Sequence, residues 1–314
     1  MRTIQVIAPG LCTTVQDMGR EGFGPLGISV SGAADSIALR LGNRLAENIE
    51  GAAALEMTLL GGKFLFPEGA VIALAGSDFG ATLNNDPVPL WTSLRVTSGQ
   101  ILKLGSTQAG ARCYLCVRGG VVVPHFLGSA STHILSGLGG FEGRALRKGD
   151  SLQIGDAEDF FRQRKIAPQA LPQLLPKKTL RVTPGPQSDW FSCEAHRLFH
   201  SSQYRVSEKS NRMGLRLEGS AVALARISGA MITEGVALGA IQIPEGGQPI
   251  ILFVELQTTG GYPKIANVIS ADLPSVGQLR PRDEVDFKPV SWADASLALR
   301  EQEALLASDT LILD

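Results

Sequence analysis

The spacing of apolar residues predicts a mainly β protein. Between residues 54 and 154, short apolar runs such as 71–75 and 113–117 alternate with turns made of Gly, Asn-Asn-Asp-Pro or Ser-Gly. Runs of this length, bounded by turn residues, are typical of an all-β barrel or sandwich. An earlier stretch differs, because its apolar residues recur every three or four positions. It predicts an amphipathic helix over residues 33–47, with Ser31 as its N-cap and Asp35 in its first turn.

A proline-rich basic segment divides the chain. Residues 162–178 contain Pro168, Pro172 and Pro176 among lysine and arginine residues, which predicts a linker between domains at 1–161 and 179–314. The second half echoes the first in the same order: LRVTPG (180–185) corresponds to IQVIAPG (4–10), FVELQTTGG (253–261) to YLCVRGG (114–120), and LRPRD (279–283) to LRKGD (146–150). We therefore predict a duplication into two related β-barrels, with further helices at 189–200 and 292–307.

Composition excludes several classes of partner. A net charge of −1 provides no basic excess, so we expect no nucleic acid. No apolar run approaches the roughly 20 residues of a membrane span. The cysteines are few and scattered, which suits a reducing cytoplasm. Cys113 and Cys116 are three residues apart in a predicted strand and should point to opposite faces. His196 and His200 lack the glutamate of an HExxH motif, and we expect no metal site.

A glycine loop after the most apolar strand is the main candidate site. Residues 249–254 read as a buried strand, and polar residues begin where it ends. Two adjacent glycines are predicted to adopt positive φ or to approach a ligand closely, while hydroxyls and a mobile lysine cation surround them. The loop is either an anion- or carbonyl-binding site or an ordinary turn. It comprises Gln257, Thr258, Thr259, Gly260, Gly261, Tyr262, Pro263 and Lys264.

Further polar residues lie in other glycine-rich segments. They are Thr13, Thr14, Gln16, Asp17, Arg20, Ser31, Ser210, Asn211, Arg212, Glu255 and Asp272. Such groups suit the polarisation of an amide or ureido carbonyl. Lys264 and Arg212 would stabilise developing negative charge, and Asp272 or Glu255 would act as a base or orient one. The structural alternatives are an ion pair between Arg212 and Asp272, and a surface Lys264 paired with Glu255 or Asp272. The chain has no P-loop, no nucleophile elbow and no Met-Lys biotin-attachment pair.

Three stretches resemble one known family. QTTGGYPKIANVISADL (257–273), PGLCTTVQDMGREGFGPLGISVSGAADSIALRLGN (9–43) and SNRMGLRLEG (210–219) are similar to the allophanate hydrolase subunit 2 family, also called the biotin-dependent carboxyltransferase A/B-subdomain family. Within it, the chain resembles in particular the C subunit of bacterial ATP-dependent 5-oxoprolinase. One departure is Glu255, where relatives usually carry Asp. The resemblance implies two cyclophilin-like β-barrel domains.

The resemblance also implies a reaction and partners. Bacterial 5-oxoprolinase opens the lactam of 5-oxo-L-proline to L-glutamate with ATP, and requires A, B and C subunits. A C-type chain would form its site together with the B subunit, would share ATP and Mg²⁺ with its partners, and would be inactive alone. Relatives also include the carboxyltransferase part of urea carboxylase, whose biotin would have to come from another protein, and an antagonist of a sporulation-kinase inhibitor. Family membership alone leaves these alternatives open.

Overall fold

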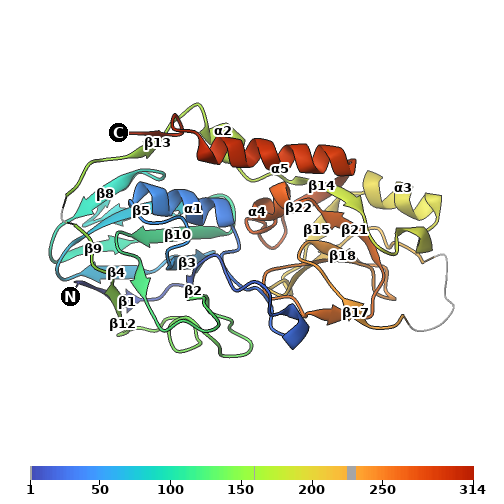
Figure 1. Ribbon diagram of the computed structural model, residues 1–314, viewed down its shortest axis with the longest axis horizontal. Helices are drawn as coiled ribbons and strands as arrows, with labels where there is room; N and C mark the ends of the chain where they lie inside the picture. Colours follow the sequence, from blue (N-terminus) through green and yellow to red (C-terminus); the bar gives the residue numbers. More distant parts are fainter. Residues whose placement is uncertain (1, 159, 225–230) are drawn as a thin grey trace. The chain divides into compact units, whose positions relative to one another are not determined.

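The protein folds into two compact, mainly β units. The computed structural model describes residues 2–158, 160–224 and 231–314. Unit 1 contains residues 1–20, 31–175 and 306–314, and unit 2 contains residues 21–30 and 176–305. The prediction of a mainly β fold is confirmed, and the strands of each unit are seen in Figure 1.

Unit 1 is built from two antiparallel sheets that share a core. One sheet has the order β11 (Val121–Val122), β12 (Ser151–Ile154), β1 (Arg2–Ala8), β4 (Lys63–Phe66), β9 (Gln100–Lys103), β6 (Thr82–Leu83) and β7 (Asp86–Pro87). The other has the order β2 (Cys12–Gln16), β3 (Ala54–Thr58), β10 (Arg112–Val117), β5 (Ala70–Gly76) and β8 (Ser93–Val96). The buried core includes Ile4 and Phe64 from the first sheet and Leu74 and Leu115 from the second.

Helix α1 (Ser36–Leu45) begins later than predicted. Asp35 is its N-cap, because the Asp35 side chain accepts a hydrogen bond from the Ala38 amide at 3.0 Å. Ser31 is not the cap; its φ is 57° and its hydroxyl donates to the Thr132 carbonyl at 2.9 Å. The error arose because a serine and an aspartate both suit this role, and sequence alone does not choose between them.

The two cysteines of β10 face opposite sides of their sheet, as predicted. Cys113 belongs to the shared core, whereas Cys116 lies against α1, where a Cβ on Gly42 would come within 2.7 Å of its sulfur. Burial raises the pKa of both thiols. Both are free thiols that fill the packed interior.

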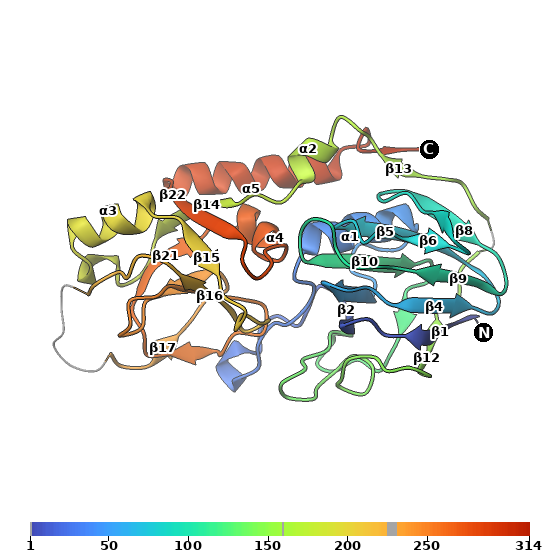
Figure 2. The same ribbon diagram turned by 180° about the vertical axis from the view of Figure 1, so that it is seen from behind.

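Unit 2 contains a closed barrel. Its strands follow the order β14 (Thr179–Pro184), β21 (Lys264–Val268), β18 (Ala240–Gln242), β19 (Ile250–Leu252), β16 (Gly214–Glu218), β15 (Tyr204–Val206) and β22 (Glu284–Pro289), and parallel pairing of β22 with β14 closes the ring. A separate two-stranded antiparallel ladder pairs β17 (Glu234–Gly235) with β20 (Thr259–Gly260), and β18 and β19 lie between them in the chain. Figure 2 shows β17 and the barrel strands β14, β15, β16, β21 and β22 from behind. Short helices complete the unit: η1 (Gly24–Leu26), η2 (Ser188–Trp190), α3 (Cys193–Ser201), η3 (Ser270–Asp272) and α4 (Leu273–Val276).

One sequence echo corresponds to matching local geometry. Asp150 accepts a hydrogen bond from the Arg147 amide at 2.7 Å, and Asp283 accepts one from the Arg280 amide at 2.9 Å. Each turn leads into a strand, β12 or β22. The echo between β1 and β14 does not extend to strand pairing, because β1 pairs with β12 antiparallel whereas β14 pairs with β22 parallel.

The proline-rich segment 162–178 contains more regular structure than the predicted linker. Within residues 162–178, β13 (Lys165–Ile166) pairs with β23 (Ile312–Leu313), and α2 (Leu171–Leu174) follows. Residues 306–314 therefore belong to unit 1, not to the second domain where the sequence placed them. Helix α5 (Trp292–Ala307) matches its predicted bounds. Ser291 and Asp294 form its capping box, with Asp294 N donating to Ser291 Oγ at 3.1 Å.

No helix in the described ranges combines the length and apolarity that crossing a membrane requires. Nor does any group of three or more His, Cys, Asp or Glu side chains in those ranges have the arrangement of a metal site.

Candidate functional site

Lys264 is a buried cation at the start of a barrel strand. It opens β21, its exposed fraction is 2%, and its Nζ lies 2.5 Å from Glu234 Oε1. The prediction that Lys264 is a mobile cation in the glycine loop is therefore wrong. The prediction that it pairs with Glu255 or Asp272 is also wrong, because its partner is Glu234. The glycine loop ends before the lysine because β21 already pairs with β18 there.

Gln187 holds both members of this ion pair. Its Oε1 accepts the Lys264 backbone N–H at 3.2 Å, and its Nε2 donates to Glu234 Oε1 at 2.8 Å. The hydrogen bonds from Lys264 and then from Gln187 hold the pKa of Glu234 below its ordinary value. The Glu234 side chain is 43% exposed, and among the described residues its second oxygen has no hydrogen-bond partner. An oriented, ionised carboxylate therefore presents one oxygen outward.

The adjacent glycines do not adopt positive φ. Neither Gly260 nor Gly261 is in the left-handed region, so the positive-φ alternative of that prediction is wrong, whereas close approach to a ligand stays a prediction. Gly260 packs closely on the barrel, since a Cβ there would lie 2.6 Å from Gln242 Nε2 and the amide would have to shift. A Cβ on Gly261 would meet Thr233 Oγ1 at an ordinary 3.5 Å. Of the two glycines, Gly260 is therefore the one in close contact with the barrel.

The remaining loop residues divide into an inner and an outer set. Gln257 is half-buried and its Nε2 donates to Gln242 Oε1 at 3.4 Å, while the Thr258 carbonyl accepts the Val236 amide at 3.1 Å. Thr259 and Tyr262 are exposed, the latter by 47%. We call the inner set the Lys264 cluster: Gln187, Glu234, Gln242, Gln257, Gly260 and Lys264.

The other proposed catalytic residues are tied into separate ion pairs of unit 2. Arg212 Nε donates to Glu255 Oε1 at 2.5 Å, and both side chains are buried. Asp272 is fully buried; its Oδ1 and Oδ2 accept from Arg181 Nη2 and Nε at 2.7 and 3.0 Å. The predicted Arg212–Asp272 pair is therefore wrong, because each has another partner. Asn211 is exposed, and its Oδ1 accepts the Met213 amide at 2.8 Å.

In unit 1, the polar residues after the first strand converge on residues 129–132. Asp17 Oδ1 accepts from Ser129 Oγ at 2.6 Å and from Ser131 Oγ at 2.5 Å, and its Oδ2 accepts the Ala130 amide at 2.7 Å. Arg20 donates to the Ser131 carbonyl and lies over the ring of Phe126. The structure thus gathers these predicted residues, but around a segment of their own chain.

Four further predicted residues lie in or beside this network. Gln16 Nε2 donates to Thr14 Oγ1 at 3.0 Å and to the Thr132 carbonyl at 3.1 Å, which also accepts from Ser31. Thr13 is fully buried and its hydroxyl donates to the Pro9 carbonyl. Gln16 and Ser31 thus hold the 129–132 segment, and Thr13 holds the turn before β2, so the contacts of these residues are structural.

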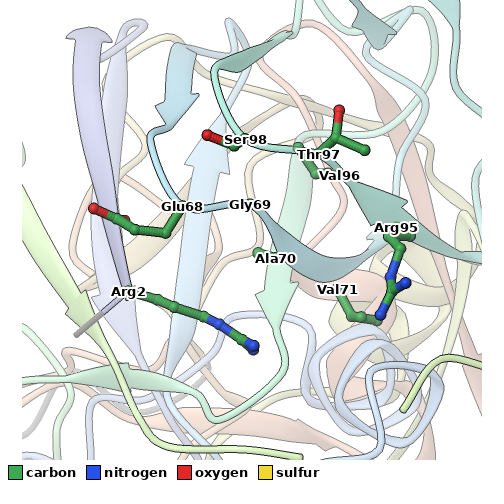
Figure 3. A pocket seen from close by; sticks show the side chains of 9 residues that line it. All are labelled: Arg2, Glu68, Gly69, Ala70, Val71, Arg95, Val96, Thr97 and Ser98. Atoms are coloured by element: carbon green, nitrogen blue, oxygen red, sulfur yellow. The ribbon is translucent and has the colours of Figure 1, made fainter. Parts of the chain in front are cut away.

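Two hollows in unit 1 lie apart from the predicted site residues. One, of about 220 Å³, is lined by Arg2, Arg95, Glu68, Thr97 and Ser98 around a floor that includes Ala70 and Val71 (Figure 3). The other, of about 460 Å³, is lined by residues that include Arg118, Asp156 and Glu158. None of the candidate residues lines either hollow.

Sequence reasoning missed the partners of the predicted lysine. Glu234, Gln187 and Gln242 were not among the candidates. Gln242 carried a usable signal, because it is a polar residue between Ile241 and Ile243 in an apolar strand. Glu234 and Gln187 carried none, since only the closed barrel brings them to Lys264.

The fold is that of a carboxyltransferase-type domain. A family model described as carboxyltransferase domain, subdomain A and B, matches residues 26–289, and the chain belongs to this family. It is 38% identical to the C subunit of 5-oxoprolinase from Escherichia coli over 302 residues, covering 96% of this chain and 95% of that protein. Identity to the C subunit of 5-oxoprolinase from Haemophilus influenzae is 36% over 301 residues, covering 96% of both.

Larger enzymes contain a related segment. Saccharomyces cerevisiae urea amidolyase is 35% identical over 96% of this chain but over only 17% of its own length. The crystal structure of K. lactis urea amidolyase superposes with a TM-score of 0.91 at 35% identity, covering 99% of this chain and 21% of that chain.

Proposed function

We propose that this chain is the C-type subunit of an ATP-dependent 5-oxoprolinase, acting with A and B subunits to open 5-oxo-L-proline to L-glutamate. The supporting observation is mutual coverage: similarity extends over 96% of this chain and at least 95% of two 5-oxoprolinase C subunits. For urea amidolyase it extends over a small part of the larger protein. The chain has no P-loop motif, so we assign ATP and Mg²⁺ to a site shared with the partner subunits.

The chemistry must make a poor nitrogen leaving group depart. In the proposed sequence the lactam oxygen attacks the γ-phosphorus of ATP, and ADP leaves. Water then adds to the ring carbon, the C–N bond breaks, and the nitrogen leaves with a proton as the amine. A second water releases phosphate from the acyl phosphate. One ATP and two waters thus yield glutamate, ADP and phosphate.

Two residues of the Lys264 cluster suit the water-addition step. Glu234 is ionised at neutral pH, and the hydrogen bonds that lower its pKa hold the carboxylate in place; its second oxygen would take the proton of the attacking water. Lys264, 2.5 Å from that carboxylate, would stabilise negative charge on the substrate.

The other sequence candidates receive supporting roles in this proposal. Arg212, Glu255 and Asp272 are each tied in a buried ion pair, and breaking such a pair typically costs about 3–5 kcal/mol. We therefore assign these three residues to the rigidity of the unit that carries Lys264.

The test is reconstitution with the partner subunits. The chain should co-purify with its B-type partner, and the assembly with the A-type subunit should release glutamate from 5-oxoproline only when ATP is present. The isolated chain should release none. Substantial turnover by the chain alone would contradict the shared site, and an inactive full assembly would contradict the assigned reaction.

A carboxyltransferase is the second candidate, favoured by the superposition on urea amidolyase. The ureido ring of biotin offers a carbonyl acceptor and N–H donors, which the lysine and glutamine side chains of the cluster fit. Bound carboxybiotin would supply the carboxyl group and be left as biotin, and these side chains would orient the acceptor amide. This function requires a separate biotinylated protein, so carboxyl transfer dependent on such a protein distinguishes it from hydrolysis.

A further inference from the structure

Gln242 contains a buried donor with no partner. It ends strand β18 with an exposed fraction of 1%, and its Nε2 has no hydrogen bond among the described residues. Nearly all buried polar side-chain atoms in folded proteins are hydrogen-bonded, because an unmade bond costs free energy. An orphan donor beside the Lys264 cluster is therefore a marker for a ligand.

The amide is oriented and covered by the cluster itself. Gln257 Nε2 donates to Gln242 Oε1 at 3.4 Å, which leaves Nε2 as the unpaired end of the Gln242 carboxamide. Gly260 lies over that donor, since a Cβ on Gly260 would be 2.6 Å from Nε2. A larger residue at this position would occupy the space in which an acceptor must lie.

Strand register places this donor beside the lysine. Gln242 and Lys264 are direct cross-strand partners on β18 and β21, and Glu234 and Gly260 are direct partners on the β17–β20 ladder. Lys264 reaches Glu234, and Gln242 lies under Gly260. The barrel thus presents a neutral donor and a cation next to each other, both covered by the same two-stranded ladder.

We propose that Gln242 recognises the substrate by donating its Nε2–H to the carbonyl oxygen of a cyclic or ureido amide. This inference deepens the proposed function and rests on it. The neutral Gln242 donor binds the uncharged carbonyl of the ground state, whereas the adjacent Lys264 cation interacts with charge that develops later. Gln242 thus binds the amide carbonyl of the substrate, and Lys264 stabilises the charge that develops during the reaction.

Access requires Gly260 to move away from Gln242 Nε2. The β17–β20 ladder consists of two residue pairs and a further bond from the Val236 amide to the Thr258 carbonyl, and short ladders of this kind open locally at low free-energy cost. Gly260 lies on β20, whereas Glu234 lies on β17 and is held by Lys264 and Gln187, so Gly260 can move while Glu234 stays in place. The substrate carbonyl then takes the place of Gly260 against Nε2.

The experiment is Gln242→Met in the complex assembled from all three proteins, with 5-oxoproline as the varied substrate. Methionine keeps the length and volume but removes the donor. KM should rise roughly 10- to 100-fold, the effect of one lost hydrogen bond to a buried partner, while kcat stays within about threefold. The melting temperature should fall little, because the lost donor has no partner among the described residues and the lost acceptor Oε1 holds only the 3.4 Å bond from half-buried Gln257.

Gln278→Met is the matched control. Gln278 is a buried glutamine of the same unit outside the cluster, with interactions of its own. Its replacement should lower the melting temperature and leave KM unchanged. If Gln242→Met does not assemble, Gln242→Glu, which also lacks the N–H donor, should show the same rise in KM.

The outcomes separate this inference from the proposed function. An active wild-type complex whose KM is unchanged by both Gln242 variants overturns the role of Gln242 alone. A lower melting temperature with unchanged KM would assign Gln242 to the barrel structure, which also overturns it. A wild-type complex that does not turn over 5-oxoproline contradicts the proposed function instead.

Discussion

Replacing Lys264 with methionine is the sharpest test of the catalytic proposal. The Lys264 side chain is 2% exposed, so most of what it contributes to packing comes from its aliphatic stem. Methionine retains a stem of similar length and removes the charge. Alanine would also remove the stem and leave a cavity, which typically costs about 2–5 kcal/mol for a large buried side chain. Lys264→Ala would then lose activity and stability together and would decide nothing.

The expected change in stability follows from the exposure of the partner. A hydrogen bond to a charged group contributes about 1.5–3 kcal/mol. Glu234 is 43% exposed, so its carboxylate is rehydrated once Lys264 is gone, and the cost of burying the ammonium group disappears too. We therefore expect Lys264→Met to lower the unfolding free energy by about 1 kcal/mol, which is roughly 2–4 °C in Tm for a unit of this size.

The expected change in activity is much larger. If the Lys264 cation stabilises charge that develops in the transition state, its loss should lower kcat roughly 10²–10³-fold, as for an oxyanion-hole donor. The assay is ATP-dependent glutamate release by the reconstituted complex beside a thermal melt. Lys178→Met is the control, because Lys178 is 63% exposed and pairs with Asp283 at 3.3 Å. A normal kcat for Lys264→Met would refute the assignment.

Three further outcomes test the local geometry. Asp17→Ala leaves four donors without their acceptor and should lower the unfolding free energy by about 2–4 kcal/mol in urea titrations; a loss below about 1 kcal/mol would contradict this. Gly260→Ala displaces the Gln242 amide and should raise KM for 5-oxoproline, whereas Gly261→Ala should match wild type; equal effects would refute the close-approach argument. Because the pKa of Glu234 is lowered in the folded protein, wild type should have a higher unfolding free energy than Glu234→Gln above pH 4.5. This difference in unfolding free energy should vanish as the pH falls through the lowered pKa, and a difference that does not change with pH would refute the charge pairing.

Local signals in the sequence predicted local structure well. The Ser291–Asp294 capping box fixed the start of α5, because both partners lie within one helical turn. Alternation and turn residues predicted the mainly β class for the same reason. The N-cap of α1 failed because two suitable residues, Ser31 and Asp35, compete within four positions, and contact with the Thr132 carbonyl decided between them.

Pairing between distant residues could not be predicted. Lys264 and Glu234 are 30 positions apart, and Asp17 and Ser131 are 114 apart. A buried charge needs a partner, and the sequence offers many suitable residues. Only the strand register decides which of them lies beside it. The sequence therefore indicated Lys264 as a special residue but suggested the wrong partners for it.

The glycine pair shows a different limit. A conformational need for positive φ and a steric need for a missing Cβ both select glycine. At Gly260 the steric need holds, because Gln242 Nε2 occupies the space of a side chain. Gly261 shows neither need among the described residues of unit 2. Sequence reveals the residue type but not which of the two reasons requires it.

The arrangement of the cluster also explains why a buried lysine and an orphan amide persist together. Each is unfavourable alone, since a buried cation needs a partner and an unpaired donor loses its hydration. Their costs fall on one two-stranded ladder, because Glu234 neutralises Lys264 and the facing Gly260 covers the Gln242 amide without a side chain. A substrate carbonyl that replaces Gly260 would satisfy the amide and leave the Lys264–Glu234 pair in place. Binding would then relieve the cost of the unpaired donor, which favours substrates that offer a carbonyl acceptor at this position.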